Sequence, residues 1–353
     1  MVKKNQTSTG QMTEENSIAS QLSVAMTSTG MTFTGEITVT PSSPRGIEYY
    51  FQIAAMVIGV IGTAANALVL YALIASKQHK KNVLIVHQNA IDLFTSVFIT
   101  VTYVAKLCNI RLTGSVGYWL CTTILSECIS WCGTNASALN LAIITVERYL
   151  KVVYPAWCQN KLRSWMLYSA MAMAWIITVI NNIAMVFPTS GVIDRVCYAY
   201  AIWKNQMARI SYFVWNFLAF YIIILIIFMF CYWRILLAIR RQARVMASHA
   251  ASASNAAHNK YNQIQSNVTK TMIFVSTCYA ISWLPSYTVY MIFIIHPYPV
   301  AYGDIYYGCM LLAYSYMCTN PFIYATKLDP VKNVLLRVIL CEKPPMQGAV
   351  AAA

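Results

Sequence analysis

Three polar signatures interrupt stretches of the sequence that are otherwise almost entirely apolar. A Glu-Arg-Tyr tripeptide at 147–149 ends one stretch, and Asn-Pro-Phe-Ile-Tyr at 320–324 ends another. Asp92 stands in the middle of a third. Charged residues and proline are costly in an apolar medium, so they are usually retained there for function. A charge in a low-dielectric cleft needs a partner in every state of the protein, whereas a buried carboxyl group can remain neutral within hydrogen bonds.

Seven long apolar stretches carry these signatures and must position them. The chain has 353 residues, of which 58% are hydrophobic and 10% are charged, whereas soluble domains carry about 25% charged residues. Each stretch spans the ~20 residues that a membrane helix needs. The alternating segments of a membrane β-barrel are absent from the sequence. We therefore predict an all-α membrane protein, a seven-transmembrane helix bundle, over Ile47–Ala75, Val83–Cys108, Tyr118–Val152, Arg163–Phe187, Met207–Ile239, Ile264–Ile295 and Ala301–Ala325.

The sequence divides into three parts around this bundle. Residues 1–46 are rich in Ser, Thr, Met and Gly without periodicity, which predicts a disordered extracellular tail. Residues 47–325 form the bundle, and residues 326–353 are predicted to be a cytoplasmic amphipathic helix and a short tail. Lys and Arg gather on one set of loops, as at 240–244, which predicts that the N-terminus lies outside and the C-terminus inside. The predicted location is the plasma membrane, with several passes.

Charge and motifs argue against other classes of function, of which a transporter or channel is kept as the less favoured alternative. The net charge of +14 follows the cytoplasmic helix ends, where anionic lipids of the bilayer attract it, so it does not indicate nucleic-acid binding. A transporter or channel usually shows inverted repeats or several intramembrane charges, and here only Asp92 is deep. His-Glu-x-x-His and Gly-x-Ser-x-Gly are absent from the sequence, so we do not expect an enzyme.

Taken in chain order, the signatures resemble those of the rhodopsin-like (class A) family of G-protein-coupled receptors. Further matches are Gly62–Asn66 on the first helix, Asp92 on the second, Trp175 on the fourth and Ser282–Pro285 on the sixth. Each motif alone is weak, but together and in order they form a strong joint signal over Ile47 to Cys341. The resemblance implies a receptor that binds an extracellular ligand. It would activate a heterotrimeric G protein through helix rearrangement at the cytoplasmic face.

The family's activation residues can be carried over one by one. The resemblance implies that Glu147 holds Arg148 in the inactive state and that Arg148 faces the G protein in the active state. Tyr232 and Tyr324 resemble two tyrosines that turn inward on activation, and the two helix-interior prolines would act as kinks. The predicted switch comprises Glu147, Arg148, Tyr149, Tyr232, Trp283, Pro285, Asn320, Pro321 and Tyr324.

Asp92 also matches a family position that binds a sodium ion favouring the inactive state. Asp92, Ser137 and Asn320 match that site, whereas Tyr316 stands where another Asn often helps. The alternative is a neutral, protonated Asp92 that hydrogen-bonds to its neighbours. Sodium, as an allosteric modulator, is the only cofactor that the resemblance implies.

Three covalent features are predicted. Cys121 and Cys197 fall on the oxidising outer side and match the family's disulfide, although the family spacing to Arg148 is about two residues shorter and points to Thr123. Asn5 fits a glycosylation acceptor. Cys341 follows the short amphipathic run Pro330–Leu340 and resembles a palmitoylated cysteine, with an unmodified thiol as the alternative.

The fifth predicted helix departs from the family because it contains no proline. Ala138 and Tyr279 also replace the apolar and Phe residues that usually pack against that proline. The usual coupling between the ligand pocket and the sixth helix is therefore in doubt, and we expect a modified packing change.

The predicted ligand site mostly excludes ligand classes. Ser130 replaces the Asp of amine receptors, and Tyr314 replaces the retinal-binding Lys of light-sensing members. Glu127 could receive a cation or only hydrogen-bond at the interface. The mixed-charge, aromatic outer mouth favours a neuropeptide-like ligand, with a non-peptide small molecule as the alternative. The predicted ligand contacts are Glu127, Ser130, Trp283, Tyr287 and Tyr314; arrestin is a further expected partner.

Overall fold

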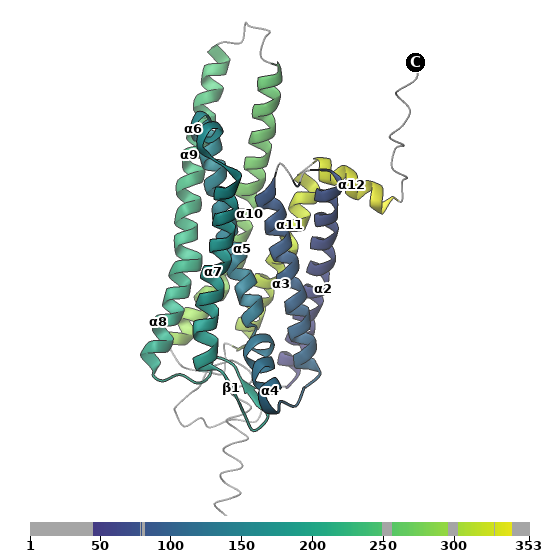
Figure 1. Cartoon of the computed structure of the whole chain (residues 1–353), viewed down its shortest axis with the longest axis vertical. Helices are drawn as coiled ribbons and strands as arrows, with labels where there is room; N and C mark the ends of the chain where they lie inside the picture. Colours follow the sequence, from purple (N-terminus) through teal and green to yellow (C-terminus); the bar gives the residue numbers. More distant parts are fainter. Residues whose placement is uncertain are drawn as a thin grey trace, which may run out of the picture.

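The computed structural model describes residues 45–77, 79, 82–248, 256–295, 303–327 and 329–340. Long helices packed side by side make up the body of the molecule (Figure 1). They are α2 (Arg45–Ala75), α3 (Val83–Leu107), α5 (Cys128–Val153), α7 (Ser164–Thr189), α9 (Ile223–Ser248), α10 (Ala256–Ile295) and α11 (Gly303–Lys327). Shorter helices are α4 (Gly114–Leu120), α6 (Pro155–Lys161), α8 (Gln206–Phe217) and α12 (Asp329–Ile339), with π-helical turns η2 (Cys121–Leu125) and η3 (Leu218–Ile222).

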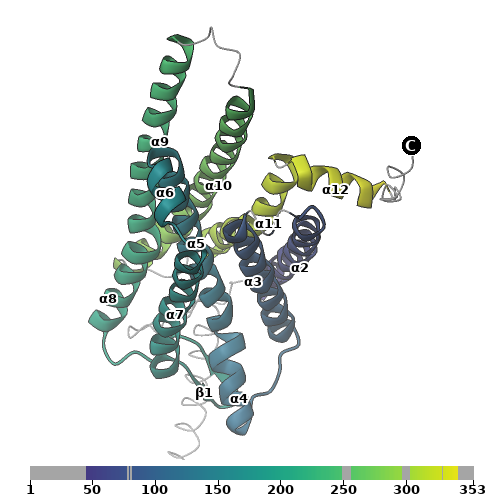
Figure 2. The same cartoon turned by 45° about the horizontal axis from the view of Figure 1, so that its top comes forward.

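Within the described residues, five helical segments are long and apolar enough to cross a bilayer. They are Gly46–Ala75, Val83–Leu107, Gly114–Val153, Ser164–Thr189 and Gln206–Arg241. Helices α10 and α11 run alongside them (Figures 1 and 2). The predicted helical bundle is therefore confirmed.

Two of the predicted helices are not uniform. The third predicted stretch is divided into α4, η2 and α5, and Glu127 adopts a left-handed backbone (φ 61°, ψ 17°) just before α5 begins. The fifth is divided into α8, η3 and α9. The apolar pattern could not reveal either interruption, because a π-turn changes the hydrogen-bond register without changing composition.

Small and amide side chains let neighbouring helices approach closely. A Cβ on Gly62 of α2 would lie 2.6 Å from the Ser96 hydroxyl oxygen of α3. Asn66 Nδ2 donates to the Met317 carbonyl of α11 at 3.1 Å, and Asn89 Nδ2 donates to the Asn66 carbonyl at 3.1 Å. Such small residues and interhelical amide bonds are typical of helix packing in membranes. They fix α2, α3 and α11 relative to one another.

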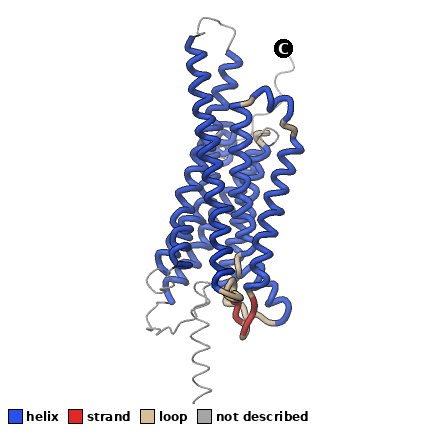
Figure 3. Tube along the Cα trace, turned by 90° about the vertical axis from the view of Figure 1, so that its left-hand side faces the viewer, coloured by secondary structure: helices blue, strands red, loops and turns tan. Residues whose placement is uncertain are grey.

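The two ends of the bundle differ. At one end, β1 (Gly191–Ile193) and β2 (Val196–Tyr198) pair antiparallel beyond the helices (Figure 3). Cys197 of β2 forms the predicted disulfide with Cys121, at a Cα–Cα distance of 5.3 Å. At the other end, α12 turns away from the bundle axis (Figure 2). Its Val331 and Leu335 are buried against the core, as its amphipathic pattern predicts.

Some predictions lie outside the described residues. The tail before residue 45, Asn5 and Cys341 belong to this group. Tyr324 lies on α11, but its side chain is not described. The domain limits, glycosylation and palmitoylation therefore stay predictions.

Candidate functional site

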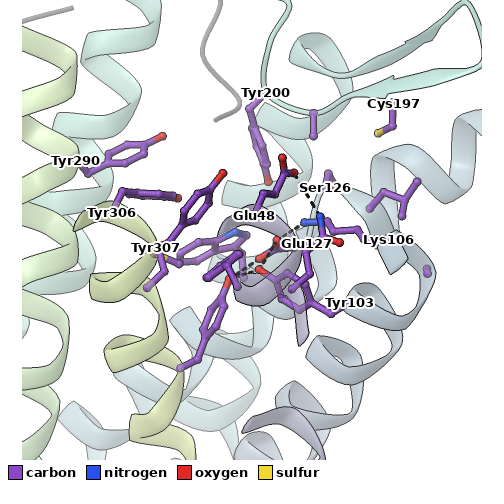
Figure 4. Close-up of a pocket in the computed structure, with 18 of the residues that line it drawn as sticks. Glu48, Tyr103, Lys106, Ser126, Glu127, Cys197, Tyr200, Tyr290, Tyr306 and Tyr307 are labelled. Carbon is purple, nitrogen blue, oxygen red and sulfur yellow. Dashed lines mark hydrogen bonds and ion pairs between the residues drawn. The ribbon is translucent and has the colours of Figure 1, made fainter. Parts of the chain in front are cut away.

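A cavity of about 530 Å³ opens at the hairpin end of the bundle (Figure 4). Residues from α2, α3, α5, α8, α10, α11 and the hairpin line it. Its charged lining residues are Glu48, Lys106, Glu127 and Arg195, and its phenols are Tyr103, Tyr200, Tyr212, Tyr287, Tyr290, Tyr306, Tyr307 and Tyr314. Burial raises the pKa of Tyr200 well above its usual value, so this phenol is a neutral hydrogen-bonding group. The cavity therefore offers many aromatic surfaces and a balanced set of charges.

Glu127 joins three helices at the cavity wall. Its carboxylate pairs with Lys106 and accepts a hydrogen bond from the Tyr103 hydroxyl at 3.0 Å, both on α3. Its other oxygen accepts from the Tyr314 hydroxyl of α11 at 2.6 Å. Figure 4 shows Tyr103 and Lys106 meeting at Glu127. Charge-assisted bonds of this kind are stronger than neutral ones, so Glu127 fixes the distances between α3, α5 and α11.

The interruption before α5 explains the unusual cysteine spacing. The π-turn Cys121–Leu125 and the left-handed Glu127 take up extra residues between the disulfide and Arg148. Cys121 therefore reaches Cys197 although it stands about two residues too early for an unbroken helix. The same interruption directs Glu127 into the cavity, where a backbone conformation unusual for a non-glycine residue often accompanies function.

Four of the five predicted ligand contacts line the cavity, and Ser130 does not. Glu127, Trp131 and Asn135 face the cavity at intervals of four residues, which is one face of a helix. Ser130 is one residue away from this face and is buried. The alignment of Ser130 with the amine-binding Asp therefore does not place it at the cavity wall.

Aromatic rings continue from the cavity floor toward the middle of the bundle. Trp283 contacts Trp131 and Tyr287, each with ring centroids 6.0 Å apart. Below it, the ring centroid of Tyr279 lies 6.4 Å from that of Trp283 and 5.5 Å from that of Tyr316 on α11. These ring contacts form a continuous column from the cavity floor at Trp283 to Tyr316, which lies one helical turn before Asn320 on α11.

Reciprocal tyrosine bonds connect the fifth and sixth helices where the family proline is missing. Tyr221 of η3 donates its hydroxyl to the Ala280 carbonyl at 2.8 Å. Tyr279 of α10 donates to the Phe220 carbonyl at 2.6 Å. A π-turn, like a proline, frees a backbone carbonyl from its helical partner. The π-turn and the two phenols therefore take the place of the missing proline contact, and the modified packing change on activation stays a prediction.

A polar centre in the middle of the bundle, made by Gln88, Asp92, Ser137 and Asn320, brings together the three residues predicted to bind sodium. Ser137 donates its hydroxyl to Asp92 Oδ1 at 2.8 Å, and Asn320 Nδ2 donates to Asp92 Oδ2 at 2.7 Å. Gln88 joins them by donating to Asp92 at 3.2 and 3.3 Å. All four side chains are buried.

At the end opposite the hairpin, Glu147 and Arg148 form a buried ion pair. Arg148 Nε lies 3.2 Å from Glu147 Oε2, and the exposed fractions of the two residues are 4% and 6%. Arg148 also donates to Asn82 at 3.5 Å, and Lys151 pairs with the other Glu147 oxygen. The guanidinium thus lies against its neighbouring acid, as the resemblance implied, and the role of this pair as a switch stays a prediction.

Tyr232 connects three helices near this ion pair. Its hydroxyl lies 2.9 Å from Thr145 Oγ1 of α5 and 2.7 Å from Ser276 Oγ of α10. It also donates to the Met272 carbonyl at 3.2 Å. Neighbouring Tyr149 instead packs against Phe230 of α9, with centroids 5.8 Å apart. Tyr232 therefore stabilises the closed contact of α9 and α10 with α5.

Among the members of these groups that were not predicted from the sequence are Tyr103, Lys106 and Gln88. Each is a polar residue within a helix, and Lys106 lies three residues after Tyr103, on the same helix face. That pattern could have marked a polar face on α3. Their partners could not be found, because partners on α5 and α11 depend on how closely the helices approach.

A helical bundle with a ligand-sized cavity at one end and a buried acid–arginine pair at the other is the architecture of a membrane receptor. The chain belongs to the rhodopsin family of 7-transmembrane receptors, whose model matches residues 65–324. It is thus a multi-pass plasma-membrane protein of a receptor family, not of an enzyme family.

Named relatives agree with this assignment. The chain is 23% identical over 314 residues to neuropeptide Y receptor type 4 of Rattus norvegicus, covering 82% of this chain and 79% of the relative. It is 23% identical over 319 residues to galanin receptor type 1 of Rattus norvegicus, covering 85% and 87%. Among solved structures, squid rhodopsin superposes with a TM-score of 0.68 at 18% identity, covering 88% of this chain and 93% of that chain.

Proposed function

We propose that this receptor binds an extracellular peptide in the cavity and, in response, activates a heterotrimeric G protein at the Arg148 end. The observation that carries the proposal is the continuity between the two ends. The aromatic column runs from the cavity floor at Trp283 to Tyr279, whose hydroxyl donates a hydrogen bond to the Phe220 carbonyl of the fifth helix. A ligand that shifts Trp283 therefore acts on the α9–α10 contact that Tyr232 closes below.

The ligand class follows from the cavity and from the relatives. A volume of about 530 Å³ lies within the usual ~300–1,000 Å³ of small-ligand sites. It accommodates one end of a peptide while the remainder lies outside. The relatives are named as receptors for neuropeptide Y and galanin. We assign ligand contact to Trp283, Tyr287 and Tyr314, and to Glu127 the additional role of holding the wall.

The proposed G-protein face is the Arg148 end, which is then cytoplasmic. Release of Arg148 from Glu147 would free the guanidinium for the G protein. The kinks at Pro285 and Pro321, inside α10 and α11, let the inner helix ends swing while the outer ends hold the ligand. Arrestin stays a predicted further partner.

Ligand class is tested by exposing cells that express the receptor to peptide extracts and to a small-molecule panel. The extract fraction that activates the receptor is expected to lose this effect after protease treatment. Tyr287→Ala, in the cavity, should shift the response to at least about tenfold higher concentrations, since a buried aromatic anchor is worth 2 kcal/mol or more. Ile281→Ala is the matched control, because Ile281 is 63% exposed on the same helix.

The outcomes distinguish ligand class from receptor function. A protease-resistant agonist whose potency still depends on Tyr287 would support the non-peptide alternative and overturn the peptide assignment. If an agonist had the same potency at Tyr287→Ala and at Ile281→Ala, the ligand would bind outside this cavity.

A further inference from the structure

The polar centre contains Gln88, a side chain beyond the three residues predicted to bind sodium. Gln88 is fully buried, and its Nε2 donates to both oxygens of Asp92 and to Ser137 Oγ. Ser137 and Asn320 also donate to the same carboxyl group. Both Asp92 oxygens are thus surrounded by N–H and O–H donors supplied by the protein.

A chain of hydrogen bonds fixes which end of the Gln88 amide faces Asp92. Trp175 Nε1 can only donate, and it donates to His87 Nε2 at 3.2 Å. His87 must therefore carry its proton on Nδ1, which lies 3.0 Å from Asn140 Oδ1 and donates to it.

The next two amides are oriented by the same chain of hydrogen bonds. Because Asn140 Oδ1 accepts from His87, its Nδ2 is the group that donates to Gln88 Oε1, at 2.8 Å. The Gln88 oxygen is then occupied, and its NH₂ group is left facing Asp92 and Ser137. The orientation at the polar centre is thus dictated from Trp175, on α7.

This orientation does not fit a bound cation. Hard cations such as sodium take oxygen ligands. Gln88 instead directs two N–H groups at the oxygens that would bind the ion, and its own carbonyl oxygen faces Asn140. Tyr316, the other departure from the expected site, is buried beside Tyr279 and brings a phenol in place of an amide.

We propose that the Gln88 amide takes the place of the cation, so that this receptor holds its polar centre closed without sodium. The side chain supplies hydrogen bonds to Asp92 and Ser137 permanently, since it is tethered to α3. Removing it should expose the three oxygen-bearing residues Asp92, Ser137 and Asn320 to an ion. The proposal does not depend on the class of ligand at the cavity.

The test measures thermal unfolding of the purified full-length receptor in sodium chloride and in N-methylglucamine chloride at equal ionic strength. The wild-type Tm is expected to be the same in both salts. Gln88→Leu should gain a sodium-specific rise of about 3 °C when sodium is about ten times its Kd. Asp92→Asn added to Gln88→Leu is the matched control and should abolish that rise.

Two results would overturn the proposal. One is a sodium-specific rise in the wild-type Tm that Asp92→Asn removes, because the ion would then bind despite Gln88. The other is a Gln88→Leu receptor that folds and shows equal Tm values in the two salts. If Gln88→Leu does not fold, Gln88→Met preserves the side-chain length without the amide and carries the same expectation.

Discussion

At the residue scale, the proposed switch rests on how buried charges are paired. Arg148 and Glu147 are both buried and form an ion pair, and Lys151 neutralises the other oxygen of Glu147. A buried charge that loses its partner is strongly unfavourable, which is why the pair can act as a switch rather than as simple packing.

Glu147→Gln should raise ligand-free G-protein activation. The substitution keeps the shape of the side chain but removes its charge, which weakens its hold on Arg148. A loss of ~1 kcal/mol from the inactive state would raise the active fraction about fivefold. Nucleotide exchange in membranes at matched surface expression measures this, with Lys161→Gln as the control because that lysine is exposed in the last turn of α6. Unchanged or lower activity in Glu147→Gln would contradict this role.

Glu127 and Lys106 should show coupled effects on stability. Glu127→Gln leaves Lys106 without its acid and weakens the bonds from Tyr103 and Tyr314, which should cost about 2 kcal/mol after allowance for the partial exposure of Lys106. The double substitution with Lys106→Met should cost less than the sum of the two single ones. Thermal unfolding of the four proteins measures the difference. Strictly additive effects would mean that the pair does not hold α3 to α5.

At the element scale, two helix interruptions place the functional side chains. The η2 turn and Glu127 break the third helix at the cavity, and η3 breaks the fifth beside Tyr279. The sequence contained a signal for the first break, namely the offset of Cys121 from the family spacing. It contained no positive signal for the second, only the missing proline.

Tyr279→Phe should loosen the contact between the fifth and sixth helices. The Phe220 carbonyl would lose the donor that now lies 2.6 Å away, which costs about 1–2 kcal/mol for a buried acceptor. We expect a lower Tm and a severalfold higher ligand-free activity. Thr288→Ala is the control, since it removes an exposed α10 hydroxyl that bonds only within its own helix. Equal behaviour of the two variants would argue against a role for the tyrosine bonds.

At the scale of the whole molecule, the sequence predicted more of the fold than of the contacts. Apolar stretches of sufficient length predicted the bundle, and six short motifs in order predicted the family, because both depend on local composition. The disulfide partner of Cys197 was also predicted correctly. The partners of Gln88 and Lys106 could not be predicted, because they depend on interhelical distances and on donor direction.

The central claim is that ligand binding at the cavity is transmitted to Arg148. The most direct measurement is G-protein activation by an agonist in cells that express either the wild type or Arg148→Ala at equal surface levels. Arg163→Ala, an exposed arginine immediately before α7, is the control. We expect agonist binding in all three, and activation in the wild type and the control but not in Arg148→Ala. Full activation through Arg148→Ala would contradict the account.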